Sequence, residues 1–258
     1  MHPVERVRAM DKYFEPGLRR ASRIITDSAF VKQELVDVFG VNPSTVHPVY
    51  LGVEPLFAPL QQAQTQAVLQ AQGLVHGQYW LAVGTLEPRK NLQLVLRAFM
   101  QLPQRERQAC PLVLVGMKGW NTGKLEQQLQ PLIAAGEVRQ LGYISREDLA
   151  VVMAGAQALI YPSVYEGFGL PPLEAMACGV PVIASNVSSL PEVVGDAGIL
   201  IDPHDVHSLA EHMRELLEDD ALSVRLGCAA RLRSQQFTWR QCAEETTQVY
   251  KAALNKTA

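Results

Sequence analysis

Two glutamates stand eight positions apart around a glycine-rich turn in the segment YEGFGLPPLEAMACGVPVIAS, residues 165–185. Glu166 comes before the turn, and Glu174 comes after it, just beyond two prolines. Proline is tolerated in the first turn of a helix, because the N–H that it lacks would have no helical partner there. The pattern therefore predicts a turn that opens a helix and carries one carboxylate on each side.

The turn has the composition of an anion site. Gly167 and Gly169 are expected to let the backbone expose amides beside the positive end of the helix dipole. The amides concerned are those of Phe168, Gly169 and Leu170. A phosphate is the ligand that such a group of amides would suit best.

The two carboxylates have different expected roles. Glu174 would lie within the first two helical turns on the ligand side, where a carboxylate can accept hydrogen bonds from two ribose hydroxyls. Glu166 would lie at the end of the preceding strand and face a sugar. A structural role, such as pairing with the helix dipole, explains either glutamate equally well when it is taken alone.

A second segment, GTLEPRKN at residues 84–91, places two cations after an expected strand. Gly84 permits a close approach of the backbone, and Arg89 and Lys90 could form charge-assisted hydrogen bonds with a diphosphate. Asn91 could instead cap the helix that follows. The alternative for the whole segment is a solvated loop with two surface cations.

A third segment, LGYISREDL at residues 141–149, ends another expected strand. Gly142, Tyr143 and Ile144 would lie beside the same cleft, where a nucleobase could rest against the backbone and an aromatic face. An ordinary surface loop is the alternative interpretation. No Gly-x-Gly-x-x-Gly, Walker lysine motif or serine nucleophile elbow accompanies these segments.

The elements that must position these groups alternate between strand and helix. Nearly continuous apolar strands separated by helices indicate a parallel sheet that is covered on both faces. The sequence therefore predicts an α/β fold with a doubly wound, Rossmann-like parallel sheet of about six strands. Its strands are expected at residues 79–86, 111–116, 138–144, 158–163, 181–186 and 197–203.

The chain divides into four predicted parts. Residues 1–54 hold a leading helix and one βαβ unit, which is too little to bury its own core and is expected to be the remnant of another domain. Residues 55–76 read as a linker, 77–238 as the main domain, and 239–258 as a helix that crosses back to the first part. We expect an apolar exposed face on residues 1–54 and hence self-association.

Composition excludes several classes of function. The net charge of −3 and the lack of a basic block argue against nucleic acid as a partner. The four cysteines form no Cys-x-x-Cys pair, and no zinc spacing or Asp-x-Asp pair is present, so no metal site is expected. No apolar run approaches the ~20 residues of a membrane span.

Several stretches resemble the donor-binding half of the family-4 retaining glycosyltransferases, which have two Rossmann-like domains in the GT-B architecture. The resemblance covers roughly residues 20–250. It is carried by VGTLEPRKNL, GYISREDL, FTWRQCAEETTQVY and the long block from YPSVYEGFGLPPLEAMACGVPVIAS to GILIDPHD. The amino-acid sequence of these motifs is similar to that of the corresponding motifs in bacterial mannosyltransferases of polysaccharide synthesis.

The resemblance implies a role for each motif residue. Glu166 would lie by the donor hexose, and Glu174 would hold the ribose hydroxyls. Lys90 would contact the diphosphate and offset charge on the leaving nucleotide, and the amides of the glycine turn would meet the phosphate or the hexose. Several relatives have an arginine where this chain has Thr85, and Arg89 is expected to supply that second cation.

The implied activity is transfer of a hexose from a nucleotide-sugar donor, with retention, to a saccharide or lipid-linked acceptor. GDP-mannose is the first choice of donor and a UDP-sugar the second, and no cofactor is expected. The expected location is the cytoplasm, with peripheral association at the inner face of the membrane. Two alternatives remain open: a nucleotide-sugar-binding fragment without turnover, and a nucleotide-sugar epimerase of the same architecture.

Overall fold

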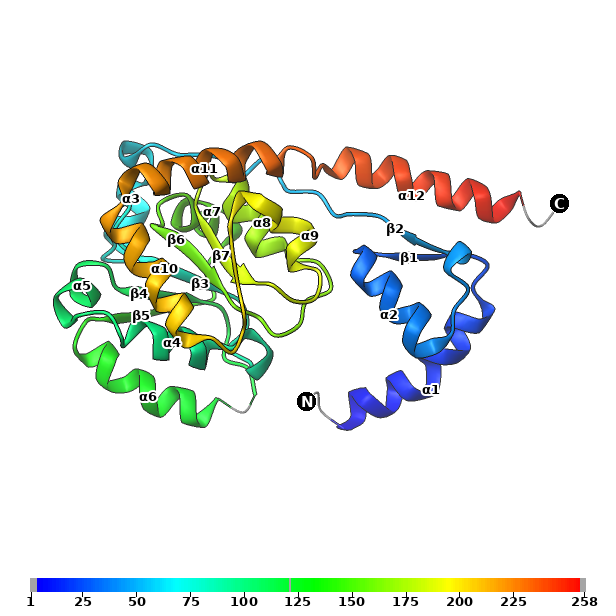
Figure 1. Cartoon of the computed structure of the whole chain (residues 1–258), viewed down its shortest axis with the longest axis horizontal. Helices are drawn as coiled ribbons and strands as arrows, with labels where there is room; N and C mark the ends of the chain where they lie inside the picture. Colours follow the sequence, from blue (N-terminus) through cyan, green and yellow to red (C-terminus); the bar gives the residue numbers. More distant parts are fainter. Residues whose placement is uncertain (1–3, 121, 256–258) are drawn as a thin grey trace. The chain divides into compact units, whose positions relative to one another are not determined.

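The computed structural model describes residues 4–120 and 122–255, which are folded into two compact units. The larger unit comprises Val53–Phe237, and the smaller one combines the chain before Val53 with the chain from Thr238 onward. Figure 1 shows the elements of each unit, coloured along the sequence.

The larger unit is built on a six-stranded sheet in which every pair of neighbouring strands is parallel. The strand order is β5-β4-β3-β6-β7-β8, so the direction of winding reverses between β3 and β6. Ligands of such sheets bind beyond the carboxyl ends of the strands at this reversal. The strands are β3 (Trp80–Val83), β4 (Leu112–Val115), β5 (Val138–Gly142), β6 (Ala158–Tyr161), β7 (Val182–Ser185) and β8 (Ile199–Ile201).

Helices cover both faces of this sheet (Figure 1). All residues of β4, β6 and β7 are buried, as expected of strands with a packed layer on each side. Alternate strand residues such as Trp80, Leu112 and Ile160 share one core cluster with α4 (Leu92–Phe99), α6 (Gly123–Ala134) and α10 (Val206–Glu218). The predicted doubly wound fold is therefore confirmed.

The remaining elements of the larger unit complete the two layers. Helix α3 packs on α7, and α8 packs on α11. The bounds are α3 (Gln62–Ala71), α5 (Gln104–Ala109), α7 (Arg146–Ala154), α8 (Leu170–Ala177), α9 (Leu190–Val194) and α11 (Asp220–Ser234), with short 3-10 turns η2 (Pro88–Lys90) and η3 (Gly195–Ala197).

The smaller unit has a parallel pair of strands, β1 (Ile24–Thr26) and β2 (Val46–Pro48). Helix α2 (Ala29–Phe39) joins them through the 3-10 turn η1 (Pro43–Thr45), and α1 (Val4–Arg20) and α12 (Trp239–Leu254) belong to the same unit. A Cβ at Gly52 would lie 2.0 Å from the backbone nitrogen of Trp239, so only glycine permits this approach. Among the described side chains, those exposed in this unit include Tyr13, Phe14, Val38 and Phe39.

One segment differs from its prediction. The sequence predicts a linker over residues 55–76, whereas the structure forms helix α3 there and packs it into the larger unit. Thr65 and Leu69 are buried one helical turn apart, and the other positions are mostly glutamine and alanine. Two buried residues on a polar background give too weak a periodicity to indicate a helix. None of the described helices is long and apolar enough to cross a membrane.

Candidate functional site

The reversal of the sheet brings together the first two predicted segments. Strand β3 leads through Gly84 and Thr85 into the turn that carries Arg89 and Lys90, and β6 leads into the loop that carries Glu166. Because β3 and β6 are hydrogen-bonded parallel neighbours, their carboxyl ends lie side by side. The cations that follow β3 and the glutamate that follows β6 are therefore close to each other.

A compact ion cluster forms at this place. Lys90 Nζ lies 2.7 Å from one carboxylate oxygen of Glu166, and an Arg89 Nη lies 2.6 Å from the other. Arg89 also bonds Glu87 at 2.5 Å and donates to the Tyr165 carbonyl at 2.8 Å. Only 12% of the Lys90 side chain and 10% of the Glu166 side chain are exposed. The solvated-loop alternative for this segment is therefore wrong.

Burial and charge act in opposite directions on this cluster. Burial alone would raise the pKa of Glu166, but the positive charges of Lys90 and Arg89 outweigh it and hold that pKa below its ordinary value. Burial lowers the pKa of Lys90, and the Glu166 carboxylate offsets part of that effect. Glu166 is thus held as a carboxylate between two cations.

Of the two cations, Lys90 has fewer hydrogen-bond partners. Its ammonium group donates to the Tyr161 hydroxyl at 2.5 Å and to Glu166, which uses two of its three N–H donors. The N–H groups of Arg89 are directed at two carboxylates, Glu87 and Glu166, and at the Tyr165 carbonyl. Lys90 is therefore better placed than Arg89 to bond a ligand oxygen.

Glycine is required where β3 ends. Gly84 has a φ of 138°, and a Cβ there would lie 3.0 Å from Lys90 Cε. The stem of the Lys90 side chain therefore occupies the space that a side chain at position 84 would need. Thr85 follows in the loop, and a Cβ at Gly119 would lie 3.0 Å from its methyl group. Asn91 does not cap α4 with its side chain, which instead donates to the carbonyls of Pro162 and Pro203.

The glycine turn opens α8 as predicted, but its two glycines differ. Gly169 precedes the helix with a φ of 129°, and a Cβ there would lie 2.9 Å from a methyl group of Leu190. Gly167 has no positive φ, and a Cβ there would meet nothing within 4 Å. The backbone therefore requires glycine at position 169 and not at position 167.

The start of α8 offers fewer amides than most helices do. Pro171 and Pro172 carry no N–H, so Leu170 supplies the only N–H of the first three helical positions. The Phe168 side chain is buried, and its ring packs edge-on against Phe237. An anion at this turn would therefore be met mainly by the backbone around Gly169 and Leu170.

Two serines just before α9 form hydrogen bonds with the backbone of the turn. The Ser188 hydroxyl accepts from the Glu166 amide at 3.0 Å, and Ser188 has a φ of 56°, unusual for a serine. The Ser189 hydroxyl is directed at the carbonyls of Glu166 and Phe168, at 2.9 and 2.6 Å. These contacts fix the backbone that carries Glu166.

Glu174 lies in α8 with only 5% of its side chain exposed. Its carboxylate accepts from Arg146 Nη2 at 3.1 Å, and the same nitrogen lies 2.5 Å from Glu54. Burial raises the pKa of Glu174 to about 7, Arg146 opposes that rise, and the negative charge of Glu54 adds to it. Glu174 is therefore poised to change its charge near neutral pH.

The third predicted segment lies at the end of β5. Gly142 has a φ of 66°, and its carbonyl accepts a hydrogen bond from the Gly116 amide, which follows β4. Tyr143 is 78% exposed, and Ile144 is half-buried. A groove of 270 Å³ at these strand ends includes Gly116, Lys118 and Gly142 in its lining.

Several residues of the site escape the sequence analysis. Tyr161 bonds Lys90, Arg146 bonds Glu174, and Ser188 and Ser189 hold the turn. Tyr161 is the last residue of an apolar strand, and this position at a strand end could have indicated that it belongs to the site. Arg146 and the serines are ordinary in type, and their partners lie 21 to 28 residues away, so no local pattern marks them.

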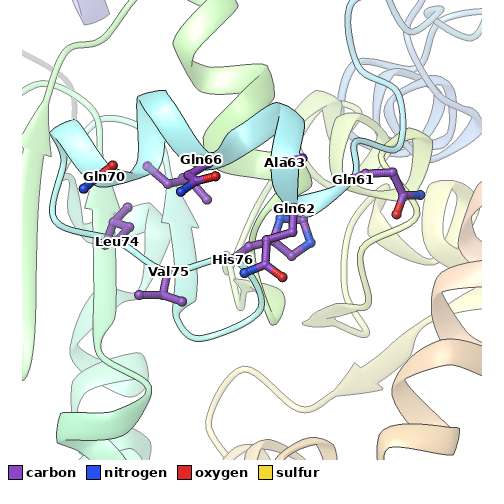
Figure 2. A pocket seen from close by; sticks show the side chains of 9 residues that line it. Gln61, Gln62, Ala63, Gln66, Gln70, Leu74, Val75 and His76 are labelled. Atoms are coloured by element: carbon purple, nitrogen blue, oxygen red, sulfur yellow. The ribbon is translucent and has the colours of Figure 1, made fainter.

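A separate groove of 670 Å³ lies along α3 and the loop after it. Figure 2 shows that Gln61, Gln62, Gln66 and Gln70 line it together with His76, and no residue of the predicted site does. Within residues 4–120 and 122–255, no group of three or more His, Cys, Asp and Glu side chains is arranged to hold a metal ion.

Known proteins resemble the chain throughout. Residues 72–233 match the model of the family Glycosyl transferases group 1. O-antigen chain mannosyltransferase B of Escherichia coli is 40% identical over 97% of this chain, and the serotype-specific mannosyltransferase WbdA of the same species is 31% identical over 87%. A crystal structure of HepE from Anabaena in complex with UDP and glucose covers 92% of the chain and 67% of its own, with a TM-score of 0.81 and 22% identity.

The chain spans only part of these relatives. It covers 66% of the length of mannosyltransferase B and 28% of the length of WbdA. At 22% identity, the likeness to HepE concerns the fold.

Proposed function

The chain belongs to the group 1 glycosyl transferases, and we propose that it moves a hexose from a nucleotide-sugar donor to a saccharide or lipid-linked acceptor with retention at the anomeric carbon. The donor would bind at the reversal of the sheet, with its diphosphate at Lys90 and its sugar at Glu166. Glu174 would hold the ribose, and the backbone of Gly142, Tyr143 and Ile144 would border the base.

The Lys90–Glu166–Arg89 cluster is the observation that carries this proposal. The Lys90 and Glu166 side chains in it are largely buried, and Arg89 is partly exposed. The cluster stands where parallel sheets bind ligands, and it combines a cation that has a third N–H donor with a fixed carboxylate. As the bond between sugar and phosphate breaks, negative charge grows on the diphosphate. A preorganised cation that meets this charge in a buried site lowers the barrier.

Mannose is the proposed sugar, and GDP-mannose the proposed donor. Support comes from two relatives that are named mannosyltransferases, one of them 40% identical. HepE was crystallised with UDP and glucose, which makes a UDP-sugar the second choice. Because two relatives carry names of transferases, transfer is favoured over epimerisation.

The reaction would take place in the cytoplasm, where nucleotide-sugars are available, and a lipid-linked acceptor would bring the protein to the inner face of the membrane. This location follows from the proposed substrates.

A transfer assay tests the proposal. The chain is incubated with GDP-mannose or UDP-glucose and a mannose-containing acceptor, and the anomeric configuration of the product is read by NMR. We expect mannosylated product in the α configuration of the donor. Product of inverted configuration, or epimerised donor without transfer, would contradict the proposed function. Calorimetry with the same donors shows whether an inactive chain still binds them.

A further inference from the structure

The carboxylate of Glu174 is connected to a second structural element through one arginine. Arg146 Nη2 lies 3.1 Å from Glu174 and 2.5 Å from Glu54, which precedes α3. The guanidinium also lies 4.9 Å from the centre of the Phe57 ring, and Phe57 is buried. Arg146 thus joins the segment 54–57, the start of α7 and the buried face of α8.

The local structure does not account for an arginine at this position. Arg146 is the first residue of α7, where the helix dipole favours negative charge and disfavours a cation. Ser145 caps the helix, and Glu147 and Asp148 supply its acidic first turn. The partners of Arg146, and not the helix, therefore explain its place.

The two carboxylates that meet Arg146 differ in exposure. The side chain of Glu54 is 47% exposed, whereas that of Glu174 is 5% exposed. A charge on Glu54 is solvated by water, but a charge on Glu174 depends on the guanidinium. Both carboxylates accept from the same nitrogen, Nη2, so Glu54 and Glu174 share the positive charge of one guanidinium.

We propose that Arg146 is a positioning residue for the donor: it holds the Glu174 carboxylate in the charged form that accepts ribose hydroxyls, and Glu54 competes for the same guanidinium. This inference rests on the proposed function, which assigns the ribose to Glu174. Arg146 itself need not touch the nucleotide.

Among the residues that the structure describes, three charged or titratable groups act on Glu174 or are acted on by it. Arg146 faces it from α7 and Glu54 from the segment before α3, and Cys178 lies on its own helix. Burial, with a contribution from Glu174, raises the pKa of the Cys178 thiol to about 12, so Cys178 stays neutral. Burial has the largest effect on the pKa of Glu174 and raises it, Arg146 lowers it, and the negative charge of Glu54 raises it.

The two substitutions should shift the pKa of Glu174 in opposite directions, whereas a general loss of structure would shift it in the same direction in both variants. Loss of the cation in Arg146→Gln should raise the pKa of Glu174 by about 1 or more, and loss of the competitor in Glu54→Gln should lower it. Arg146→Lys keeps the charge and should stay closer to wild type. Arg225→Gln, an exposed arginine on α11, is the matched control and should leave the pKa unchanged.

The experiment has two readouts on the same variants. The first is the pH titration of carboxyl-¹³C glutamate by NMR without nucleotide, with Glu174→Gln to assign the signal. The second is the calorimetric affinity for GDP and for 2′-deoxy-GDP between pH 5.5 and 8.5. We expect the preference for GDP to rise with pH, and its midpoint to move up in Arg146→Gln and down in Glu54→Gln.

The outcomes separate this inference from the proposed function. Shifts of the same sign in the two variants, or an equal loss of GDP affinity at every pH in Arg146→Gln, would overturn the positioning role. The latter result would instead mean direct contact between Arg146 and the nucleotide. If the pKa values move as expected but wild type binds neither GDP nor UDP, the coupling stands and the proposed function fails.

Discussion

At the scale of single residues, the site is a set of buried charges whose partners come from distant parts of the chain. Glu166 and Lys90 are 76 positions apart, and Glu174 and Arg146 are 28 apart. The sequence predicts Lys90 and Glu166 separately, because each follows an apolar strand. It does not predict that they pair, since the pairing depends on the strand order.

Glu174 should make the stability of the fold depend on pH. Its pKa is raised to about 7 from an ordinary value of 4.5, so between these pH values the folded chain holds a proton that the unfolded chain has released. The free energy of unfolding therefore falls as pH rises through this window, by at most about 3 kcal/mol. Glu174→Gln should remove this component.

Urea unfolding at pH 5, 6, 7 and 8 measures this effect. The stability of Glu174→Gln relative to wild type should increase across the series. A difference that stays constant from pH 5 to pH 8 would mean that Glu174 is not the group that titrates.

At the scale of elements, the sequence predicts the strands well and some connections poorly. Each of the six strands lies within its predicted range, because continuous apolar residues are typical of a buried parallel strand. Helix α3 is missed because glutamines fill its exposed positions. The serine pair before α9 is also missed, since the sequence does not reveal that it faces the turn that carries Glu166.

The start of α8 provides a matched pair of substitutions. Gly169→Ala should destabilise the fold by about 1–3 kcal/mol, because alanine disfavours a φ of 129° and its Cβ would press on Leu190. Gly167→Ala should change stability by no more than about 0.5 kcal/mol, since its Cβ would meet open space. Donor affinity should fall in the first variant only.

Thermal and urea unfolding of the two alanine variants, with calorimetry against GDP, check this pair. Equal stability of the two variants would show that the conformation of Gly169 does not determine how α8 begins.

At the scale of the whole molecule, the chain comprises two compact units, and the proposed donor site lies in the larger one. The boundaries predicted from the sequence stand at 54 and 238, while the structure divides after Gly52 and after Phe237. Within the larger unit, every predicted site residue follows β3 or β6 or lies at or just after the end of β5. The positions of the glycosyltransferase motifs along the sequence thus correspond to the carboxyl edge of the sheet.

Donor binding should not depend on a divalent metal. Lys90 and Arg89 already place two positive charges where the diphosphate is expected. Calorimetry with GDP in the presence of EDTA should therefore give the same affinity as in buffer without chelator. A loss of affinity in EDTA that magnesium or manganese restores would contradict this expectation.

The central claim is that Lys90, at the reversal of the sheet, binds the diphosphate of the donor, and calorimetry with Lys90→Ala tests it most directly. Lys124→Ala, an exposed lysine on α6, is the control. Loss of a charged hydrogen bond should cost GDP about 1.5–3 kcal/mol, which is at least about tenfold in affinity, and should change GMP affinity much less. Equal losses for GDP and GMP, or unchanged binding of both, would contradict the account.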